Sequence, residues 1–445
     1  MFLTAQFVEC IIIAVSAIFL LLSVVKDREV CSPYVAFNIV WLLVGLMLLF
    51  GNSQIFQPSV LATTIVLVGV IGFNISVLIP RITINGKRLL VKEEERVFLA
   101  GRCQMLAIVM VLCWVFVSMS SIGLLLSGSS LSDVRESYYS TDTGPAWLYY
   151  VKNYFLLPGT DAVIVASIIS FIRQEKKSRL LLACTVLLVL LRAISSGGRY
   201  ILINTLLMVV CALALFKALS NMPRKKKCAL YFSLIVFALL IVVFTNERTT
   251  ANTESLPLFE KLYLTTYTYF SGSVTFLGEL MATFPQIEGS TGIACFIGGF
   301  LGPVFTVLSF LKIMPYPDFM NIIGIYACAP LAIGPSTYYN AMPTAFGYFF
   351  IDGGLIAVFI ESLIFGYICN RTYRVAQTGD ALFRGFYIML FVQICMISTR
   401  WFFFTSDSAL AFFFLLFLFR PLPKKKIAPS KGLIGLTTLD KDKAE

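Results

Sequence analysis

The sequence contains no histidine. This absence excludes zinc sites built on imidazole ligands and the Ser-His-Asp arrangement of many hydrolases, because both need an imidazole nitrogen. Charged residues are scarce, at 13% of the 445 positions, and the 11 cysteines show no Cys-x-x-Cys spacing. A metal-binding or disulfide-stapled framework is therefore not indicated.

What the chain has instead is apolar sequence, with 58% hydrophobic residues and a mean hydropathy of +0.86. Such a composition is too apolar for an ordinary water-soluble domain. Runs of about 20 apolar residues are long enough to cross a bilayer as helices. The first run lacks a basic start and a cleavage site, so we interpret it as a retained span. The sequence predicts one all-α polytopic membrane domain over residues 1–445, with about eleven transmembrane helices at 3–25, 33–51, 57–79, 103–126, 147–172, 180–194, 200–219, 228–245, 344–369, 381–398 and 401–419.

The net charge of +11 is explained by its distribution, without a nucleic-acid partner. Basic residues concentrate in loops on the cytoplasmic side of membrane proteins. Six segments hold 27 of the 35 basic residues, namely 26–28, 81–102, 173–179, 217–227, 371–384 and the tail 420–445. We predict that these are cytoplasmic, which places the N-terminus outside and the C-terminus inside.

Two external loops follow from this topology, at 127–146 and 246–343. Residues 291–314 are apolar enough to span, but a full crossing there would place later basic loops outside. We therefore expect a re-entrant or interfacial helix pair, broken at Gly298-Gly299 and Gly302-Pro303.

Basic residues that run against this topology are the first functional candidates, because a basic group inside a span or at its outer end is costly without a partner or a task. The guanidinium fork matches phosphate oxygens, so arginines gathered at the outer surface indicate a pyrophosphate site. For Arg400, as for Lys152, the alternative is a side chain that extends to the lipid head groups. The candidates are Arg135, Arg192, Arg199, Arg248 and Arg400.

Three carboxylates are candidates for the catalytic base. Glu247 adjoins Arg248 at a span end, Asp161 follows Pro158-Gly159-Thr160 inside a span, and Asp352 precedes Gly353-Gly354 inside another. A carboxylate at such a depth either pairs with an arginine or performs proton chemistry. Most other acidic residues outside the cytoplasmic loops are expected to be solvated.

The large external loop also carries candidate glycan-binding residues. Aromatic faces and amides suit sugar rings, although tyrosines equally form the aromatic belt at the membrane surface. The candidates are Tyr263, Tyr267, Tyr338 and Asn340.

Three segments together resemble the Wzy-type O-antigen and capsule oligosaccharide repeat-unit polymerases. They are 126–138 (LSGSSLSDVRESY), 196–200 (SGGRY), and 340–344 (NAMPT) leading to 350–354 (FIDGG). The resemblance covers the chain from about the fourth span onward. It implies a GT-C-like helical fold with a large periplasmic loop over an arginine-rich cavity, in a bacterial inner membrane. The family's loop arginine falls on Arg135 and its helix-start arginine on Arg199, whereas Arg248 and Arg400 match less securely.

The same resemblance implies the reaction and the partners. The chain would transfer a growing glycan from undecaprenyl pyrophosphate to the sugar of a newly flipped lipid-linked repeat unit, in contact with membrane lipid and with a chain-length regulator. No DxD-like motif lies in the external loops, so we expect metal-independent, inverting chemistry without a cofactor.

Three alternatives remain at this stage. A glycan flippase or another transporter would carry ionisable residues along several spans and an internal repeat, and no clear repeat is visible. An O-antigen ligase would need an external-loop histidine, by resemblance to that related family, and none is present. A purely structural membrane subunit would leave the external arginines unexplained.

Overall fold

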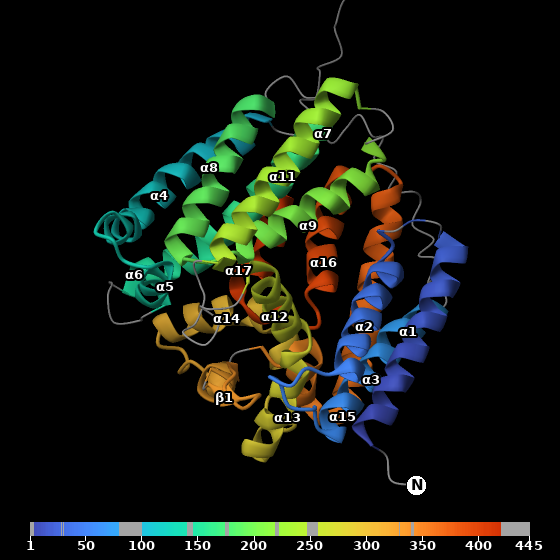
Figure 1. Ribbon diagram of the computed structural model, residues 1–445. Coiled ribbons are helices and arrows are strands. Elements are labelled where there is room, and N and C mark those ends of the chain that lie inside the picture. Colours follow the sequence, from blue (N-terminus) through green and yellow to red (C-terminus); the bar gives the residue numbers. More distant parts are fainter. Residues whose placement is uncertain are drawn as a thin grey trace, which may run out of the picture.

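The computed structural model describes residues 4–27, 29, 31–79, 100–139, 146–173, 178–218, 222–246, 257–328, 330–339 and 342–419. Long helices form a bundle, and short elements cover one end of it, the lower end in Figure 1. The helix α1 begins at this same end.

The bundle consists of long and medium-length helices. Its helices are α1 (Ala5–Asp27), α2 (Pro33–Phe50), α3 (Val60–Ile75) continued by the 3₁₀ turn η1 (Ser76–Leu78), α4 (Ala100–Leu126), α7 (Leu157–Ile172), α8 (Ser178–Ser196), α9 (Tyr200–Leu215), α11 (Arg224–Asn246), α15 (Thr344–Gln377), α16 (Ala381–Cys395) and α17 (Ser406–Leu418).

The short elements form what we call the cap. It comprises α5 (Leu131–Tyr139), α6 (Ala146–Val151) with the π-helix η4 (Lys152–Leu156), α12 (Leu258–Phe270), α13 (Gly272–Thr283), η6 (Pro285–Ile287), α14 (Ala294–Phe310), η7 (Asp318–Asn321), η8 (Ile323–Ala327), the two-stranded hairpin β1 (Leu331–Ala332) and β2 (Tyr338–Tyr339), and η9 (Phe402–Phe404).

All eleven predicted spans coincide with helices, and seven helices are long and apolar enough to cross a membrane. The helices α9, α16 and α17 are apolar but shorter, as is the apolar part of α11, Leu230–Thr245. The helices α16 and α17 are shorter than expected because residues 396–405 form a turn between them, which includes η9. The prediction of an all-α membrane protein is confirmed, while the count of eleven crossings and their orientation remain predictions.

Inside a membrane, an apolar side chain is buried equally well against lipid or protein, so small and polar side chains join the helices. The same is seen in this structure. Asn38 on α2 and Asn74 on α3 exchange two buried hydrogen bonds, of 2.8 and 3.0 Å. Where α15 crosses α3, a Cβ placed on Gly69 would lie 2.4 Å from the ring of Phe346. Glycine is needed at this crossing, which lets α15 approach α3 closely.

Residues 291–314 were expected to form a helix pair. They contain one continuous helix, α14, so that prediction was wrong. Its glycines do not break it; they allow close contact. A Cβ on Gly299 would lie 2.4 Å from the carbonyl oxygen of Thr405 and 2.6 Å from that of Phe403. In Figure 1, α14 lies across the end of the bundle.

Candidate functional site

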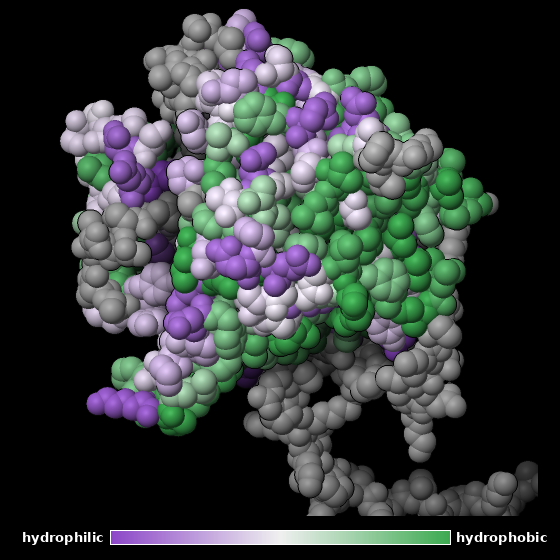
Figure 2. Space-filling model, turned by 90° about the horizontal axis from the view of Figure 1, so that it is seen from below, coloured by the Kyte–Doolittle hydropathy of each residue, from purple (hydrophilic) through white to green (hydrophobic). Residues whose placement is uncertain are grey.

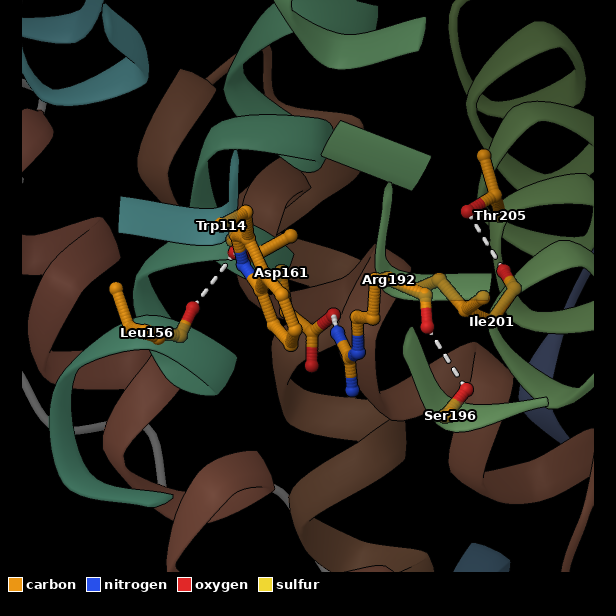
Figure 3. A network of polar contacts seen from close by, with 8 residues as sticks. Trp114, Leu156, Asp161, Arg192, Ser196, Ile201 and Thr205 are labelled. Atoms are coloured by element: carbon orange, nitrogen blue, oxygen red, sulfur yellow. Dashed lines mark hydrogen bonds and ion pairs between the residues drawn. The ribbon is translucent and has the colours of Figure 1, made fainter. Parts of the chain in front are cut away.

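The site begins with a buried ion pair between α7 and α8. Arg192 Nη1 donates to Asp161 Oδ1 at 2.5 Å, and both side chains are 9% exposed (Figure 3). The pair lies beside a second polar contact, in which Trp114 Nε1 donates to Thr160 Oγ1 at 2.8 Å. Close packing is possible here because Gly159 presents no side chain to Met110, whose Cε would lie 2.4 Å from a Cβ. Asp161 therefore orients Arg192.

A second carboxylate faces this pair from the start of α17. Asp407 lies within electrostatic reach of both Asp161 and Arg192, and also of the Tyr200 phenol at the start of α9. Its Oδ1 is buried and has no hydrogen-bond partner among the described residues. Asp407 thus retains a free acceptor atom.

Arg400 approaches the same place from the turn between α16 and α17. Its guanidinium lies 5.0 Å from the ring centroid of Phe402 and within electrostatic reach of Tyr200 and Tyr348. The rings of Phe402 and Tyr200 are themselves 5.0 Å apart. The Tyr200 phenol therefore lies within electrostatic reach of Arg400 and of the Asp161 and Asp407 carboxylates.

Arg199 is positioned by the turn that joins α8 to α9. This turn ends α8 with Gly197 at φ 53°, a conformation that glycine adopts without strain. The guanidinium of Arg199 lies 5.0 Å from the ring centroid of Tyr269 on α12, within cation–π range. Tyr269 in turn packs edge-on against Tyr339, with centroids 6.3 Å apart. Arg199 thus faces an aromatic surface of the cap.

Arg135 is brought to the same turn by α5. A Cβ on Gly197 would lie 2.4 Å from the carbonyl oxygen of Leu131 and 3.2 Å from Arg135 Cβ, so α5 rests directly on the turn. The helix α5 starts with a reciprocal cap, in which Ser130 N donates to Asp133 Oδ2 at 2.8 Å and Asp133 N donates to Ser130 Oγ at 3.2 Å. The hydrogen bonds from Ser130 lower the pKa of Asp133. The cap fixes the helix that holds Arg135.

The structure therefore gathers four of the five predicted arginines around the α8–α9 turn and the α16–α17 turn, at the cap end of the bundle. We call Asp161, Arg192, Arg199, Arg400 and Asp407, with Arg135 beside them, the arginine site. Seen from the cap end, the molecule shows hydrophilic patches toward its centre and left, and apolar surface on the side of α1–α3 (Figure 2).

Other predicted residues do not join this site. Glu247, Arg248 and Asn340 lie outside the described residues. Tyr267 is buried and donates to the carbonyl of Met47 at 3.0 Å, where it lines a small pocket between α12, α13 and the segment that joins α2 to α3. Tyr263 packs beside it, with ring centroids 6.0 Å apart, and Tyr338 is 69% exposed on β2.

Asp352 has a different partner from the arginines. Its oxygens accept hydrogen bonds from the Thr291 hydroxyl and from the backbone N–H groups of Cys295 and Phe296. It therefore caps the N-terminus of α14, and these donors occupy the atoms that a catalytic base would use.

Sequence reasoning missed Asp407 and Tyr200. Asp407 was grouped with acidic residues expected to be solvated, and its one local signal is its place in the first turn of the last span. Tyr200 directly follows Arg199 in the predicted motif, so its position was available. Within the described ranges, no three His, Cys, Asp or Glu side chains gather in a way that could hold a metal ion.

No protein-family model matches this chain, and comparisons with curated proteins and with solved structures gave no match either.

Proposed function

We propose that this chain is a membrane glycosyltransferase that polymerises lipid-linked oligosaccharide repeat units at the outer face of a bacterial inner membrane. The observation that carries the proposal is the gathering of Arg192, Arg199 and Arg400, with Arg135 adjacent, at the cap end of a membrane bundle. Guanidinium groups in this number suit a diphosphate better than a single phosphate or a neutral sugar. The motif resemblance to repeat-unit polymerases supports the same reading.

The arginines would act on the leaving group. In the proposed reaction, the C1–O bond between the donor glycan and undecaprenyl diphosphate breaks, and the diphosphate departs with a full negative charge. Positive groups held in place before the reaction stabilise that charge without needing to reorganise. Arg192 is suited to this because Asp161 fixes its guanidinium at 2.5 Å.

A base is required on the acceptor side. The acceptor hydroxyl oxygen forms the new bond to C1, and its proton passes to a carboxylate, with inversion at C1. Asp161 is bound to Arg192 and Asp352 to the α14 backbone. We therefore assign the proton to Asp407, whose Oδ1 has no partner among the described residues. Tyr269 and Tyr339 supply the aromatic surface next to Arg199 for a sugar ring.

The test is incubation of the purified protein with a synthetic undecaprenyl-diphosphate-linked repeat unit, followed by mass analysis of the lipid-linked products. The wild-type chain should yield products of two or more repeat units. Arg199→Ala and Arg400→Ala should each reduce the rate by about 10² or more, the typical effect of removing one charge-stabilising donor. Lys312→Ala is the matched control, because Lys312 is an exposed basic residue of the same external region. Unchanged product length in both arginine variants would refute the proposal.

A second candidate, a transporter of lipid-linked glycans, is favoured by one observation. The helix α15 is interrupted at Gly353-Gly354 and carries a buried carboxylate at the break, as membrane transporters often do. The same assay separates the two functions. A transporter would move the intact repeat unit across a proteoliposome membrane and leave its mass unchanged.

A further inference from the structure

A second polar site lies at the interruption of α15, apart from the arginines. Gly354 has φ 63° and ψ −156°, so the helical ladder stops there. The carbonyls of Phe350 and Ile351, near the end of the first half, accept hydrogen bonds of 3.4 Å from the backbone N–H groups of Gly289 and Thr291. The segment that leads into α14 therefore docks onto the break.

The side chain of Asp352 also binds α14 and the residues before it. We call this contact between the break in α15 and the start of α14 the junction. The hydroxyl of Thr291 donates to Oδ1 at 2.5 Å, Cys295 N donates to Oδ1 at 2.8 Å, and Phe296 N donates to Oδ2 at 2.7 Å. All three stabilise a negative charge, and the N-terminus of α14 adds its positive dipole end. Asp352 is therefore the charged member of the site.

Glu361, in the second half of the same helix, lies close enough to Asp352 for the two carboxyl groups to interact. It is only 4% exposed. Its Oε2 is buried and has no hydrogen-bond partner among the described residues. An ionised carboxylate with an unsatisfied buried oxygen beside a second negative charge would be far more costly than a neutral acid.

We propose that Asp352 and Glu361 form a proton-binding site, in which Glu361 carries a proton and donates it to the Asp352 carboxylate. A sodium ion fits less well, because three N–H and O–H donors already point at Asp352 and would repel a cation. The site does not depend on the proposed polymerase activity.

The surroundings contain few other charges. From α14, the Cys295 thiol lies within electrostatic reach of both carboxyls. From the segment before α14, Glu288 Oε1 would lie 3.0 Å from a Cβ on Gly354, so a second carboxylate borders the break. The helix α3, which packs extensively against α15, has no charged residue. Among the described residues, no basic side chain acts on Asp352 or Glu361.

Loss of the proton would open the junction. A deprotonated Glu361 would face Asp352 as a second negative charge, and its hydrogen bond to Asp352 would be lost. Repulsion of this kind is relieved when one carboxylate moves away, and Asp352 can move only by releasing the N-terminus of α14. The proton thus links the break in α15 to the position of α14.

The experiment is infrared difference spectroscopy on the purified full-length protein in lipid nanodiscs. A protonated carboxyl absorbs in a C=O stretching band that is well separated from carboxylate bands, and it shifts in heavy water. At neutral pH the wild-type protein should show this band, and Glu361→Gln should lose the component assigned to Glu361. Glu260→Gln is the matched control, because Glu260 is exposed on α12. Glu9 is also buried, so the assignment rests on the difference between variants.

Glutamine can donate an N–H to Asp352 in place of the acid proton, so Glu361→Gln should fold, and an unchanged melting temperature checks this. Asp352→Asn should shift the Glu361 band rather than remove it, because the proton loses its charged acceptor. The proposal is overturned if the spectra of Glu361→Gln and wild type coincide in this region. It is also overturned if exchanging potassium for sodium abolishes the wild-type band, since the site would then bind the cation.

Discussion

At the scale of single residues, the ion pair of Asp161 and Arg192 shows what the sequence could and could not predict. Both lie inside spans, where an unpaired charge is costly, so either a partner or a chemical task was expected for each. Basic residues at the outer face are conspicuous because the positive-inside rule makes them rare. Acidic residues follow no such rule. Asp407 therefore resembled any loop carboxylate until tertiary packing placed it beside the pair.

We predict that Asp161→Asn destabilises the protein strongly, by about 3–5 kcal/mol, because it leaves the buried Arg192 guanidinium without its counter-charge. The double variant Asp161→Asn with Arg192→Met should recover most of the stability but remain inactive in the polymerisation assay. Thermal unfolding in detergent measures the first effect. Thr205→Val, which removes only a hydrogen bond to the carbonyl of Ile201 within α9, should change stability by about 1 kcal/mol or less. Equal stability of the single and double variants would contradict this account.

At the scale of elements, two glycine pairs behaved in opposite ways. Gly298-Gly299 was expected to break a helix and lies in the continuous α14, whereas Gly353-Gly354 interrupts α15. Glycine permits a break and it also permits close packing, so the residue type alone does not distinguish them. The contacts decide. Around Gly299 the backbone of η9 approaches closely, and at the α15 break the segment 289–291 supplies replacement N–H donors.

We predict that Gly299→Ala displaces α14 from η9 and lowers the melting temperature, because the new methyl group would lie 2.4 Å from a backbone oxygen that cannot move independently. Gly123→Ala is the control. No atom lies within 4 Å of a Cβ at Gly123, on α4, so alanine there should be neutral or stabilising by up to about 1 kcal/mol through helix propensity. A Gly299→Ala protein as stable as Gly123→Ala would show that the α14 contact is unimportant for stability.

At the scale of the whole molecule, composition predicted the class, because a chain with 58% hydrophobic residues has to bury them in lipid. The structure agrees with the predicted arrangement in one further respect: α1 begins at the end that carries the cap (Figure 1). The tertiary arrangement of the cap was not predictable, because its short helices and hairpin have no long repeating pattern of apolar residues. The arginine site depends on that arrangement, which is why its arginines and Asp161 were predicted but its geometry and Asp407 were not.

The opposite end of the molecule is held by a different cluster, in which Glu29, between α1 and α2, accepts hydrogen bonds from Tyr373 at 2.5 Å and Gln377 at 2.9 Å and pairs with Lys217 at 3.3 Å. Partial burial alone would raise the pKa of Glu29, but these three partners outweigh it, and the pKa is lowered from its usual value of 4.5. A carboxyl with a lowered pKa stabilises the fold above its unfolded pKa, and this contribution is lost as the pH falls through the folded pKa.

We therefore predict that Glu29→Gln lowers the melting temperature at neutral pH, and that the difference from wild type shrinks as the pH falls below 4.5. Melting curves of both proteins across this range measure the effect, with the exposed Glu260→Gln as a variant that should show no such convergence. Because Glu29 joins the α1–α2 turn to the ends of α9 and α15, its loss should loosen three segments that are distant in sequence. A gap between the two proteins that stays constant with pH would mean that the charge of Glu29 does not hold them together.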